Sequence, residues 1–167
     1  MKRVLITGMS GVGKSSVIEE LARRGYKAID IDQPAWSEYR YLDPETGNHE
    51  EDEAEWLWKE DLVEELLATE DADMLFLSGC AANQGQFYPA LDHVVLLTAS
   101  EPLMIERLAA RTNNDFGKRP EELAKILSDK ANFEARLRAG ADLEIDTTIP
   151  LQEVADRVVA VAEGRDA

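Results

Sequence analysis

Residues 8–15 read GMSGVGKS and fit the phosphate-binding pattern G-x-x-x-x-G-K-[ST] at every fixed position. An apolar run, KRVLIT at residues 2–7, precedes this stretch, and a helical pattern starts at Lys14. Glycine at positions 8, 11 and 13 leaves room for backbone N–H groups to converge on phosphate oxygens, and the helix N-terminus adds a favourable potential. The stretch therefore predicts a strand, a P-loop and a helix that together bind a nucleoside triphosphate.

The side chains of this loop have expected roles in holding ATP and Mg²⁺, which are the expected cofactors. Lys14 is expected to bridge the β- and γ-phosphates and to act in catalysis, the hydroxyl of Ser15 to bind Mg²⁺, and Ser16 to bond an α-phosphate oxygen. The residues expected to bind the nucleotide here are Gly8, Gly11, Val12, Gly13, Lys14, Ser15 and Ser16.

Strand and helix patterns alternate along the rest of the chain. Apolar runs predict strands at residues 26–32, 74–78 and 93–99 and a strand with a turn at 143–150, and helices are predicted at 52–68, 102–110, 121–138 and 151–163. This alternation predicts an α/β three-layer sandwich around a five-stranded parallel sheet in the order 2-3-1-4-5, with the P-loop strand at its centre. The expected organisation is a single domain over residues 1–167, with an acceptor-binding insertion at about 33–70 and a lid at about 112–120.

Two aspartates, Asp30 and Asp32, close the second predicted strand. Because side chains alternate along a strand, both carboxylates are expected to point the same way at the carboxyl edge of the sheet, beside the P-loop. One carboxylate can hold the water shell of Mg²⁺, and the other can accept the proton of an attacking hydroxyl. The alternative is that either aspartate only caps the following turn.

A polar loop with arginine at both ends, RTNNDFGKRP, occupies residues 111–120 between two predicted helices. Charge spreads over a phosphoryl group during transfer, so a guanidinium that closes over it stabilises the transition state and excludes water. Arg119 is the residue expected to do this, and Lys118 is a candidate to assist it. The alternative is an ordinary loop with solvated basic side chains.

Taken together, these residues resemble the shikimate kinase branch of the P-loop kinases, which includes gluconate kinases and is related to nucleoside monophosphate kinases. The resemblance rests on GMSGVGKS, the Asp30-Ile-Asp32 pair, Arg111 with Arg119-Pro120, and the DTTIP turn at residues 146–150. It implies that Asp30 lies near Mg²⁺ and that Asp32 meets the acceptor hydroxyl. It also implies that Arg111 stacks on adenine opposite Pro150 and that Arg119 reaches the phosphates.

The acceptor-binding segments depart from shikimate kinases, which grip a carboxylate with arginines. Residues 33–70 contain only Arg40 and Lys59 as basic side chains, and the third strand runs into SGCAANQG at 78–85. We therefore expect a neutral or cationic polyhydroxy or nucleoside-like acceptor, bound by aromatic faces and amides. A gluconate-like sugar acid stays open as an alternative, if Arg40 or the pair Arg136 and Arg138 turns inward to hold one carboxylate. Arg136 and Arg138 both lie near the family's second carboxylate arginine, and the sequence does not choose between them. The residues expected at the acceptor are Asp32, Trp36, Arg40, Gly79, Asn83, Gln84 and Arg138, with Tyr39, Tyr41, Trp56 and Gln86 nearby.

Composition limits the partners. The formal net charge of −16 disfavours nucleic acid and anionic membrane surfaces, and the single cysteine, Cys80, allows no intramolecular disulfide. No secretion signal is recognised at the N-terminus, so a cytoplasmic protein is expected, as a monomer or a homodimer. Three functional alternatives to a small-molecule kinase stay open: a nucleoside monophosphate kinase, a regulatory module that binds nucleotide without transfer, and, least compatible with the charge, a polynucleotide end kinase.

Overall fold

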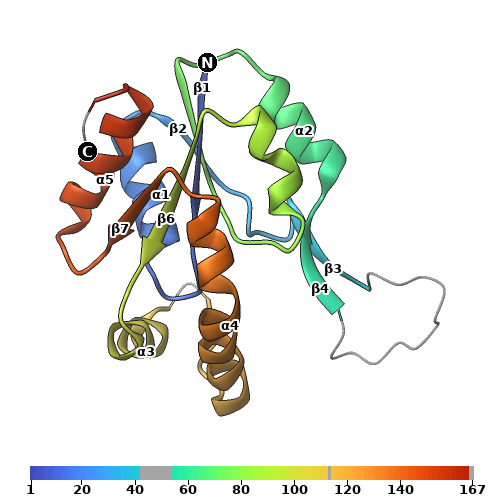
Figure 1. The fold of residues 1–167 in the computed structure, drawn as a ribbon, viewed down its shortest axis with the longest axis vertical. Helices are drawn as coiled ribbons and strands as arrows, with labels where there is room; N and C mark the ends of the chain where they lie inside the picture. The colour runs from blue at the N-terminus through green and yellow to red at the C-terminus, as the bar shows by residue number, and fades with distance from the viewer. Residues whose placement is uncertain (42–53, 113, 166–167) are drawn as a thin grey trace.

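The central element of the fold is a five-stranded parallel sheet (Figure 1). The computed structural model describes residues 1–41, 54–112 and 114–165. The strand order is β2-β5-β1-β6-β7, which confirms the predicted order with the P-loop strand in the middle. The strands are β1 (Lys2–Thr7), β2 (Lys27–Asp30), β5 (Met74–Ser78), β6 (His93–Thr98) and β7 (Leu143–Asp146).

Helices cover both faces of this sheet, because its strands are apolar on both sides. Along β1, Val4 and Ile6 pack in the cluster that contains α1 (Lys14–Arg23) and α5 (Leu151–Ala162), whereas Leu5 packs in the cluster that contains α2 (Glu60–Ala68). Phe87 of the 3₁₀ helix η2 (Gln84–Ala90) joins the second cluster.

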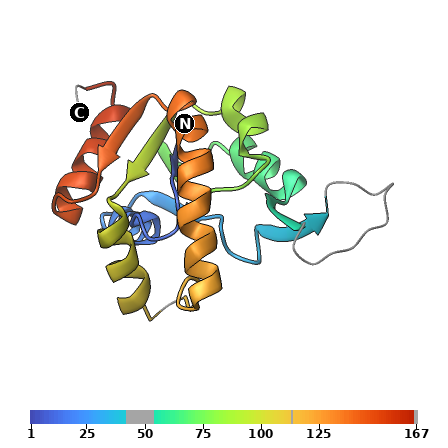
Figure 2. The same cartoon turned by 60° about the horizontal axis from the view of Figure 1, so that its bottom comes forward.

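Two further helices stand at the carboxyl edge of the sheet, where the P-loop lies. They are α3 (Glu101–Ala110) and α4 (Pro120–Ala139). Figure 2 brings this edge forward and shows α3 and the start of α4 beside each other below the strands. The loop predicted as a lid connects the two helices.

A two-stranded antiparallel sheet, β3 (Ser37–Tyr41) and β4 (Ala54–Trp58), corrects the prediction of a helix over residues 52–68. Only its later part, from Glu60, is helical. The run AEWLW is too short for its periodicity to separate strand from helix, and pairing with residues 37–41 makes it a strand. The segment between the two strands, residues 42–53, and the side chain of Tyr41 lie outside the described residues.

The second strand is shorter than expected, since it ends at Asp30. Ile31 still donates its N–H to the carbonyl oxygen of Ser78, so the chain follows β5 for one more residue before it turns. Asp30 and Asp32 therefore do not belong to one regular strand, although both stay at the carboxyl edge.

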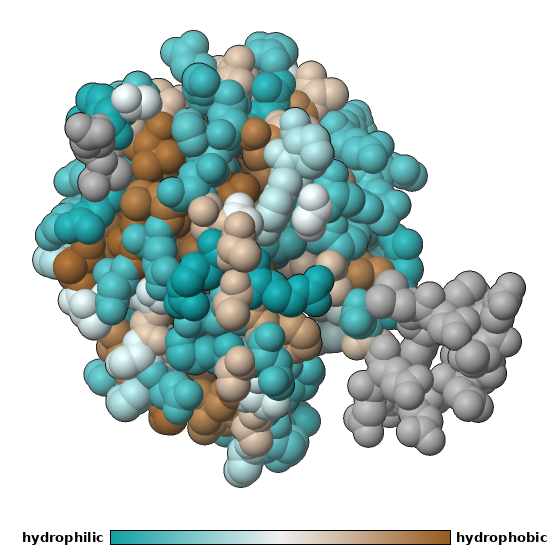
Figure 3. All heavy atoms as spheres, in the orientation of Figure 1, coloured by the Kyte–Doolittle hydropathy of each residue, from teal (hydrophilic) through white to brown (hydrophobic). Residues whose placement is uncertain are grey.

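The outer surface on the side drawn in Figure 3 is largely hydrophilic, with hydrophobic atoms showing between the polar side chains. Within the described residues, no helix has both the length and the apolar character that a membrane crossing requires.

Helices α1 and α5 are held together by a group of charged side chains around Glu20. Glu20 is buried and accepts hydrogen bonds from Arg23 at 2.8 and 2.9 Å and from Arg24 at 2.8 Å. Arg24 in turn donates to Asp156 on α5 at 2.6 Å. Hydrogen bonds from Arg23 and Arg24 lower the pKa of Glu20 to about 2.

This lowered pKa predicts how stability depends on pH. The Glu20 carboxylate stabilises the fold above its unfolded-state pKa of 4.5, and this stabilisation is lost as pH falls toward the folded-state pKa of about 2. Glu20→Gln should therefore lower the melting temperature at pH 7, and the difference from wild type should shrink between pH 5 and pH 2 in thermal melts. The control is the exposed neighbour Glu19→Gln, which should show a smaller difference. A Glu20→Gln effect that does not change with pH would contradict the assignment.

Candidate functional site

The P-loop leaves β1 at Thr7 and enters α1 at Lys14, so it lies at the carboxyl edge of the sheet. Gly8 adopts φ +144°, and a Cβ atom there would lie 2.4 Å from the carbonyl oxygen of Leu97 on β6. Only glycine fits this close approach of two backbones. The loop is thus packed against the neighbouring strand before any ligand binds.

A second support comes from an arginine that the sequence did not single out. Arg107 on α3 donates to the carbonyl oxygen of Val12 at 3.0 Å and to the side chain and carbonyl oxygens of Thr147, both at 2.7 Å. Thr147 itself donates to the carbonyl oxygen of Val12 at 2.8 Å. The buried carbonyl of Val12 is therefore held by two elements that follow the P-loop in the chain by about a hundred residues or more.

The Lys14 side chain turns back onto the backbone of the P-loop. Its ammonium donates to the carbonyl oxygens of Gly8 at 2.7 Å and Met9 at 3.3 Å. It also lies 3.9 Å from Oδ2 of Asp32, with only 12% of the Lys14 side chain exposed. The positive charge is thus positioned between the P-loop backbone and the carboxylate.

The residues expected at the metal lie together. Ser15 donates its hydroxyl to Oδ2 of Asp30 at 3.2 Å. Ser78 pairs with Asp30 across β5 and β2, and its fully buried hydroxyl has no hydrogen-bond partner among the described residues. Magnesium binds oxygen ligands and uses few protein groups beside substrate phosphates and water. Ser15, Asp30 and the unpartnered Ser78 hydroxyl fit such an ion, whereas no cluster of three acidic, cysteine or histidine side chains suited to a metal occurs in the described parts of the chain.

Asp32 is the most strongly bound carboxylate of the site. Both of its oxygens accept the N–H of Cys80, at 2.9 and 3.0 Å. Oδ1 also accepts the indole N–H groups of Trp56 and Trp58, each at 3.4 Å. Burial raises the pKa of Asp32, while the charge of Lys14 and the N–H of Cys80 act in the opposite direction. A carboxylate with a raised pKa beside a cation has the chemistry of a proton acceptor.

Close packing around Asp32 requires a glycine in the loop after β5. A Cβ atom at Gly79 would lie 2.8 Å from Oδ1 of Asp32 and 3.0 Å from the indole ring of Trp58. Cys80 follows directly, and burial raises the pKa of its thiol. Gly79 therefore shapes the site through the space it leaves, in addition to any contact with an acceptor.

The amides of the SGCAANQG loop turn inward. Gln84 is only 4% exposed, accepts from Thr7 at 3.2 Å and from the N–H of Ala81 at 3.1 Å, and donates to Tyr88 at 2.8 Å. Asn83 forms a two-way pair with the backbone of Trp58, accepting at 3.0 Å and donating at 2.9 Å. Both side chains, expected to bind the acceptor, are instead occupied in tying the loop to its neighbours.

The arginines of the lid do not reach the P-loop in this structure. The Arg119 side chain is 75% exposed and lies 4.0 Å from Glu122. Arg111 donates to the carbonyl oxygen of Phe116, and burial lowers its pKa. Pro150 directly precedes α5 and lies three residues after Thr147, which contacts Val12 of the P-loop. Asn113 of the expected lid lies outside the described residues.

Two basic residues expected near the acceptor are placed elsewhere. Arg138 forms ion pairs with Glu134 and Glu144 at 3.0 and 2.7 Å near the end of α4 remote from the lid. Arg136 is exposed on the same part of α4. The structure does not bring either side chain to Asp32.

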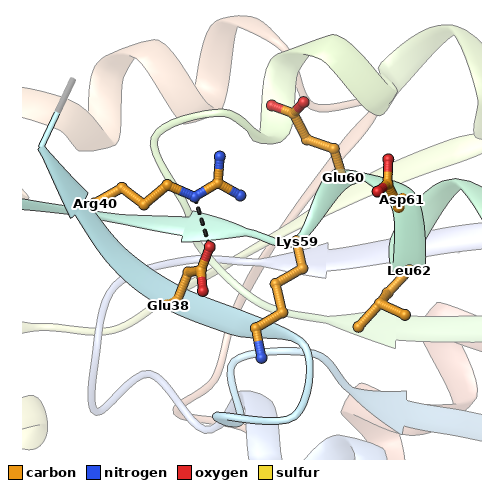
Figure 4. A pocket seen from close by; sticks show the side chains of 6 residues that line it. All are labelled: Glu38, Arg40, Lys59, Glu60, Asp61 and Leu62. Atoms are coloured by element: carbon orange, nitrogen blue, oxygen red, sulfur yellow. Dashed lines mark hydrogen bonds and ion pairs between the residues drawn. The ribbon is translucent and has the colours of Figure 1, made fainter. Parts of the chain in front are cut away.

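Arg40 lies on the opposite face of the β3–β4 pair from Asp32. The register pairs Trp56 with Tyr39 and Arg40 with Glu55. Because side chains alternate along a strand, the first pair lies on one face of the hairpin and the second pair on the other. Arg40 is paired with Glu38 at 2.6 Å in an open hollow (Figure 4). That hollow is lined by Glu38, Arg40, Lys59, Glu60, Asp61 and Leu62.

Trp36, which the sequence placed at the acceptor, is half-buried against the core beside α2.

Sequence reasoning missed Arg107, Thr147, Trp58 and Ser78 as parts of the site. Thr147 stands in the DTTIP turn that marked the resemblance, which was a usable signal. Arg107 and Trp58 fall in stretches predicted as ordinary helix, where nothing in the local pattern distinguishes them. Their roles arise from contacts between segments distant in the chain.

Comparison with known proteins agrees with this geometry. The model of a family described as AAA domain matches residues 4–137. A protein of Archaeoglobus fulgidus with the name "Putative adenylate kinase" is 31% identical over 162 residues, which cover 96% of this chain and 82% of that protein.

Solved structures show the same fold at lower identity. A shikimate kinase from Acinetobacter baumannii in complex with shikimate is 18% identical with a TM-score of 0.66, covering 98% of this chain and 94% of that one. A gluconokinase from Sinorhizobium meliloti 1021 is 22% identical with a TM-score of 0.57, covering 98% and 92%.

The fold and site define a P-loop protein of the small-molecule kinase group, as the resemblance predicted. The chain belongs to the family described as AAA domain, whose model matches most of its length.

The close packing at Gly79 predicts that two glycine-to-alanine variants differ in stability. Gly79→Ala should destabilise the protein by about 1–3 kcal/mol, because the added methyl group would collide with Asp32 and the buried Trp58. Gly85→Ala, with nothing within 4 Å of the added atom, should change stability by less than about 0.5 kcal/mol. Urea unfolding measures both. Equal midpoints for the two variants would show that the packing at Gly79 is not tight.

Proposed function

We propose that this protein is a kinase that transfers the γ-phosphate of Mg·ATP to a hydroxyl group of a small acceptor. The observation that carries the proposal is the 3.9 Å separation between the Lys14 ammonium and Oδ2 of Asp32. This distance supports a role of Asp32 as proton acceptor, because the carboxylate lies beside the residue expected to contact the β- and γ-phosphates. A module that only binds nucleotide has no need of a base at that point.

Each residue has a part in the transfer. When bound, Mg·ATP supplies the phosphoryl group and a divalent charge. The P-loop N–H groups and Lys14 would orient the phosphates and stabilise negative charge on them, and Ser15 with Asp30 would hold the ion. Asp32 accepts the proton of the attacking hydroxyl. Arg119 supports the transferring group after the loop at 112–120 closes, and Arg111 and Pro150 flank the adenine.

The acceptor that the described residues support best is neutral or cationic, such as a polyol, a sugar or a nucleoside. Trp56 and Tyr39 pack at a centroid distance of 4.8 Å, with their ring planes tilted by 59°, on the face of the β3–β4 pair that carries the Asp32 contacts. An aromatic wall beside a carboxylate suits a ring with hydroxyl groups. Arg40 is paired with Glu38, and Lys59 donates to the carbonyl oxygens of Pro34 and Ala35. Neither offers a bidentate site to an anionic acceptor.

A second candidate is a nucleoside monophosphate kinase. The observation that favours it is the 31% identity with the Archaeoglobus protein, whose name states adenylate kinase. The acceptor of a nucleoside monophosphate kinase carries a phosphate group, and proteins normally bind such a group with arginine side chains. The two candidates differ in the charge of the acceptor, so one screen can separate them.

The function is tested by ATP consumption in a coupled assay with a panel of acceptors. Neutral polyols, sugars, nucleosides and aminoglycosides should raise the rate of ATP consumption above the basal rate, whereas AMP, shikimate and gluconate should do so less. AMP as the fastest acceptor would establish the second candidate in place of the first. A basal rate that no acceptor changes, with ATP bound, would favour a regulatory module.

Lys14→Ala should reduce phosphoryl transfer about a hundredfold or more while leaving the fold intact, because the ammonium stabilises charge that develops on the phosphates. The matched control is Lys125→Ala on α4, an exposed lysine paired with Asp129 at 3.1 Å, which should leave turnover unchanged. Circular dichroism checks the fold of both variants. Unchanged turnover in Lys14→Ala would overturn the site assignment.

A further inference from the structure

We propose that Trp56 and Trp58 are positioning residues for Asp32, and that they hold Oδ1 so that Oδ2 is the oxygen that accepts the proton. This inference rests on the proposed function for its catalytic meaning. The contacts themselves belong to the structure and can be tested without any acceptor.

The two oxygens of Asp32 have different surroundings. Oδ1 accepts from the indole N–H groups of Trp56 and Trp58 at 3.4 Å and from the N–H of Cys80 at 2.9 Å. Oδ2 shares the N–H of Cys80 at 3.0 Å and faces the Lys14 ammonium at 3.9 Å. A carboxylate oxygen has two lone pairs, so three donors saturate Oδ1. The remaining acceptor capacity lies on Oδ2, on the side of the P-loop.

The indole groups reach Asp32 because β4 places them on one face, two residues apart. The strand is fixed to the loop after β5 by the Asn83 amide on the backbone of Trp58 and by the N–H of Ala82, which donates to the carbonyl oxygen of Trp56 at 3.0 Å. Trp58 is 1% exposed and packs against Phe87 at a centroid distance of 5.6 Å. The donors therefore have little freedom to move away from the carboxylate.

Other charged and titratable groups also face Asp32. They are the Lys14 ammonium from α1, the Asp30 carboxylate from β2 and the Cys80 thiol from the loop after β5. Lys14 favours the ionised carboxylate, and Asp30 disfavours it. Donated hydrogen bonds also fix the orientation of the carboxylate, so loss of an indole N–H should let Asp32 rotate away from the position in which Oδ2 faces the P-loop.

The direct test compares the indole N–H resonances of the whole protein with those of Asp32→Asn at one pH by ¹H–¹⁵N NMR. The chain has three tryptophans, so single Trp→Phe variants assign all three signals. The Trp56 and Trp58 signals should both move in Asp32→Asn, because a neutral amide replaces the charged acceptor of their hydrogen bonds. Trp36 serves as the internal reference. If Trp56 and Trp58 respond to Asp32→Asn no more than Trp36 does, the inference is wrong.

The kinetic test uses the best acceptor from the screen. In Trp56→Phe and Trp58→Phe, kcat should fall about tenfold with little change in KM for ATP, because the aromatic face is kept and only the donor that orients Asp32 is lost. The control is Phe133→Leu at an exposed position of α4, which should leave kcat unchanged. Trp58 is fully buried, so Trp56→Phe, at a half-buried position, keeps the test valid if Trp58→Phe does not fold. An unchanged kcat in a folded Trp56→Phe variant would contradict the inference.

The two tests separate the inference from the function. If no acceptor is phosphorylated, the NMR comparison still decides whether the indoles bind Asp32. If transfer occurs and the NMR comparison shows no coupling, the kinase assignment stands and the positioning role falls.

Discussion

The ammonium of Lys14 and the carboxylate of Asp32 face each other at 3.9 Å, and the rest of the site is arranged around this pair. Two charges in a partly dehydrated position are costly unless each also has hydrogen bonds. Carbonyl oxygens of the P-loop satisfy the lysine, and the Cys80 N–H with two indoles satisfies the aspartate. The pair thus depends on β1, β2 and β5 lying side by side and ending at one edge.

The hairpin of β3 and β4 extends this arrangement away from the sheet. It is outside the five parallel strands, yet it contributes the side chains that bind Asp32. Asn83 and Gln84 then act as internal connections, because their amides satisfy backbone and side-chain groups that would otherwise be buried without partners. The segment that carries the proposed acceptor wall is in this way coupled mechanically to the proposed base.

The P-loop is held by residues that follow β6 and β7, in the half of the sheet away from β2 and β5. Arg107 and Thr147 bind the carbonyl oxygen of Val12, so α3 and the turn after β7 both meet the loop. The exposed Arg119, by contrast, is free of the P-loop in this structure. In the function that we propose, this loop closes only when ligands bind, since an arginine held permanently on the phosphates would hinder exchange of the nucleotide.

The amino-acid sequence by itself determined the P-loop, the order of the parallel sheet and the position of Asp30 and Asp32 beside that loop, because these depend on local patterns and on general rules for parallel strands. It did not determine that residues 54–58 form a strand, since five apolar-rich residues satisfy either period and only pairing with 37–41 selects one. The sequence also led us to expect Gln84 at the acceptor, from its place in the loop after the third predicted strand, and Arg138, from the family resemblance. Tertiary contacts occupy both, and the same contacts bring Trp58 and Arg107 to the site, because hydrogen-bond partners distant in the chain are set only when the elements pack.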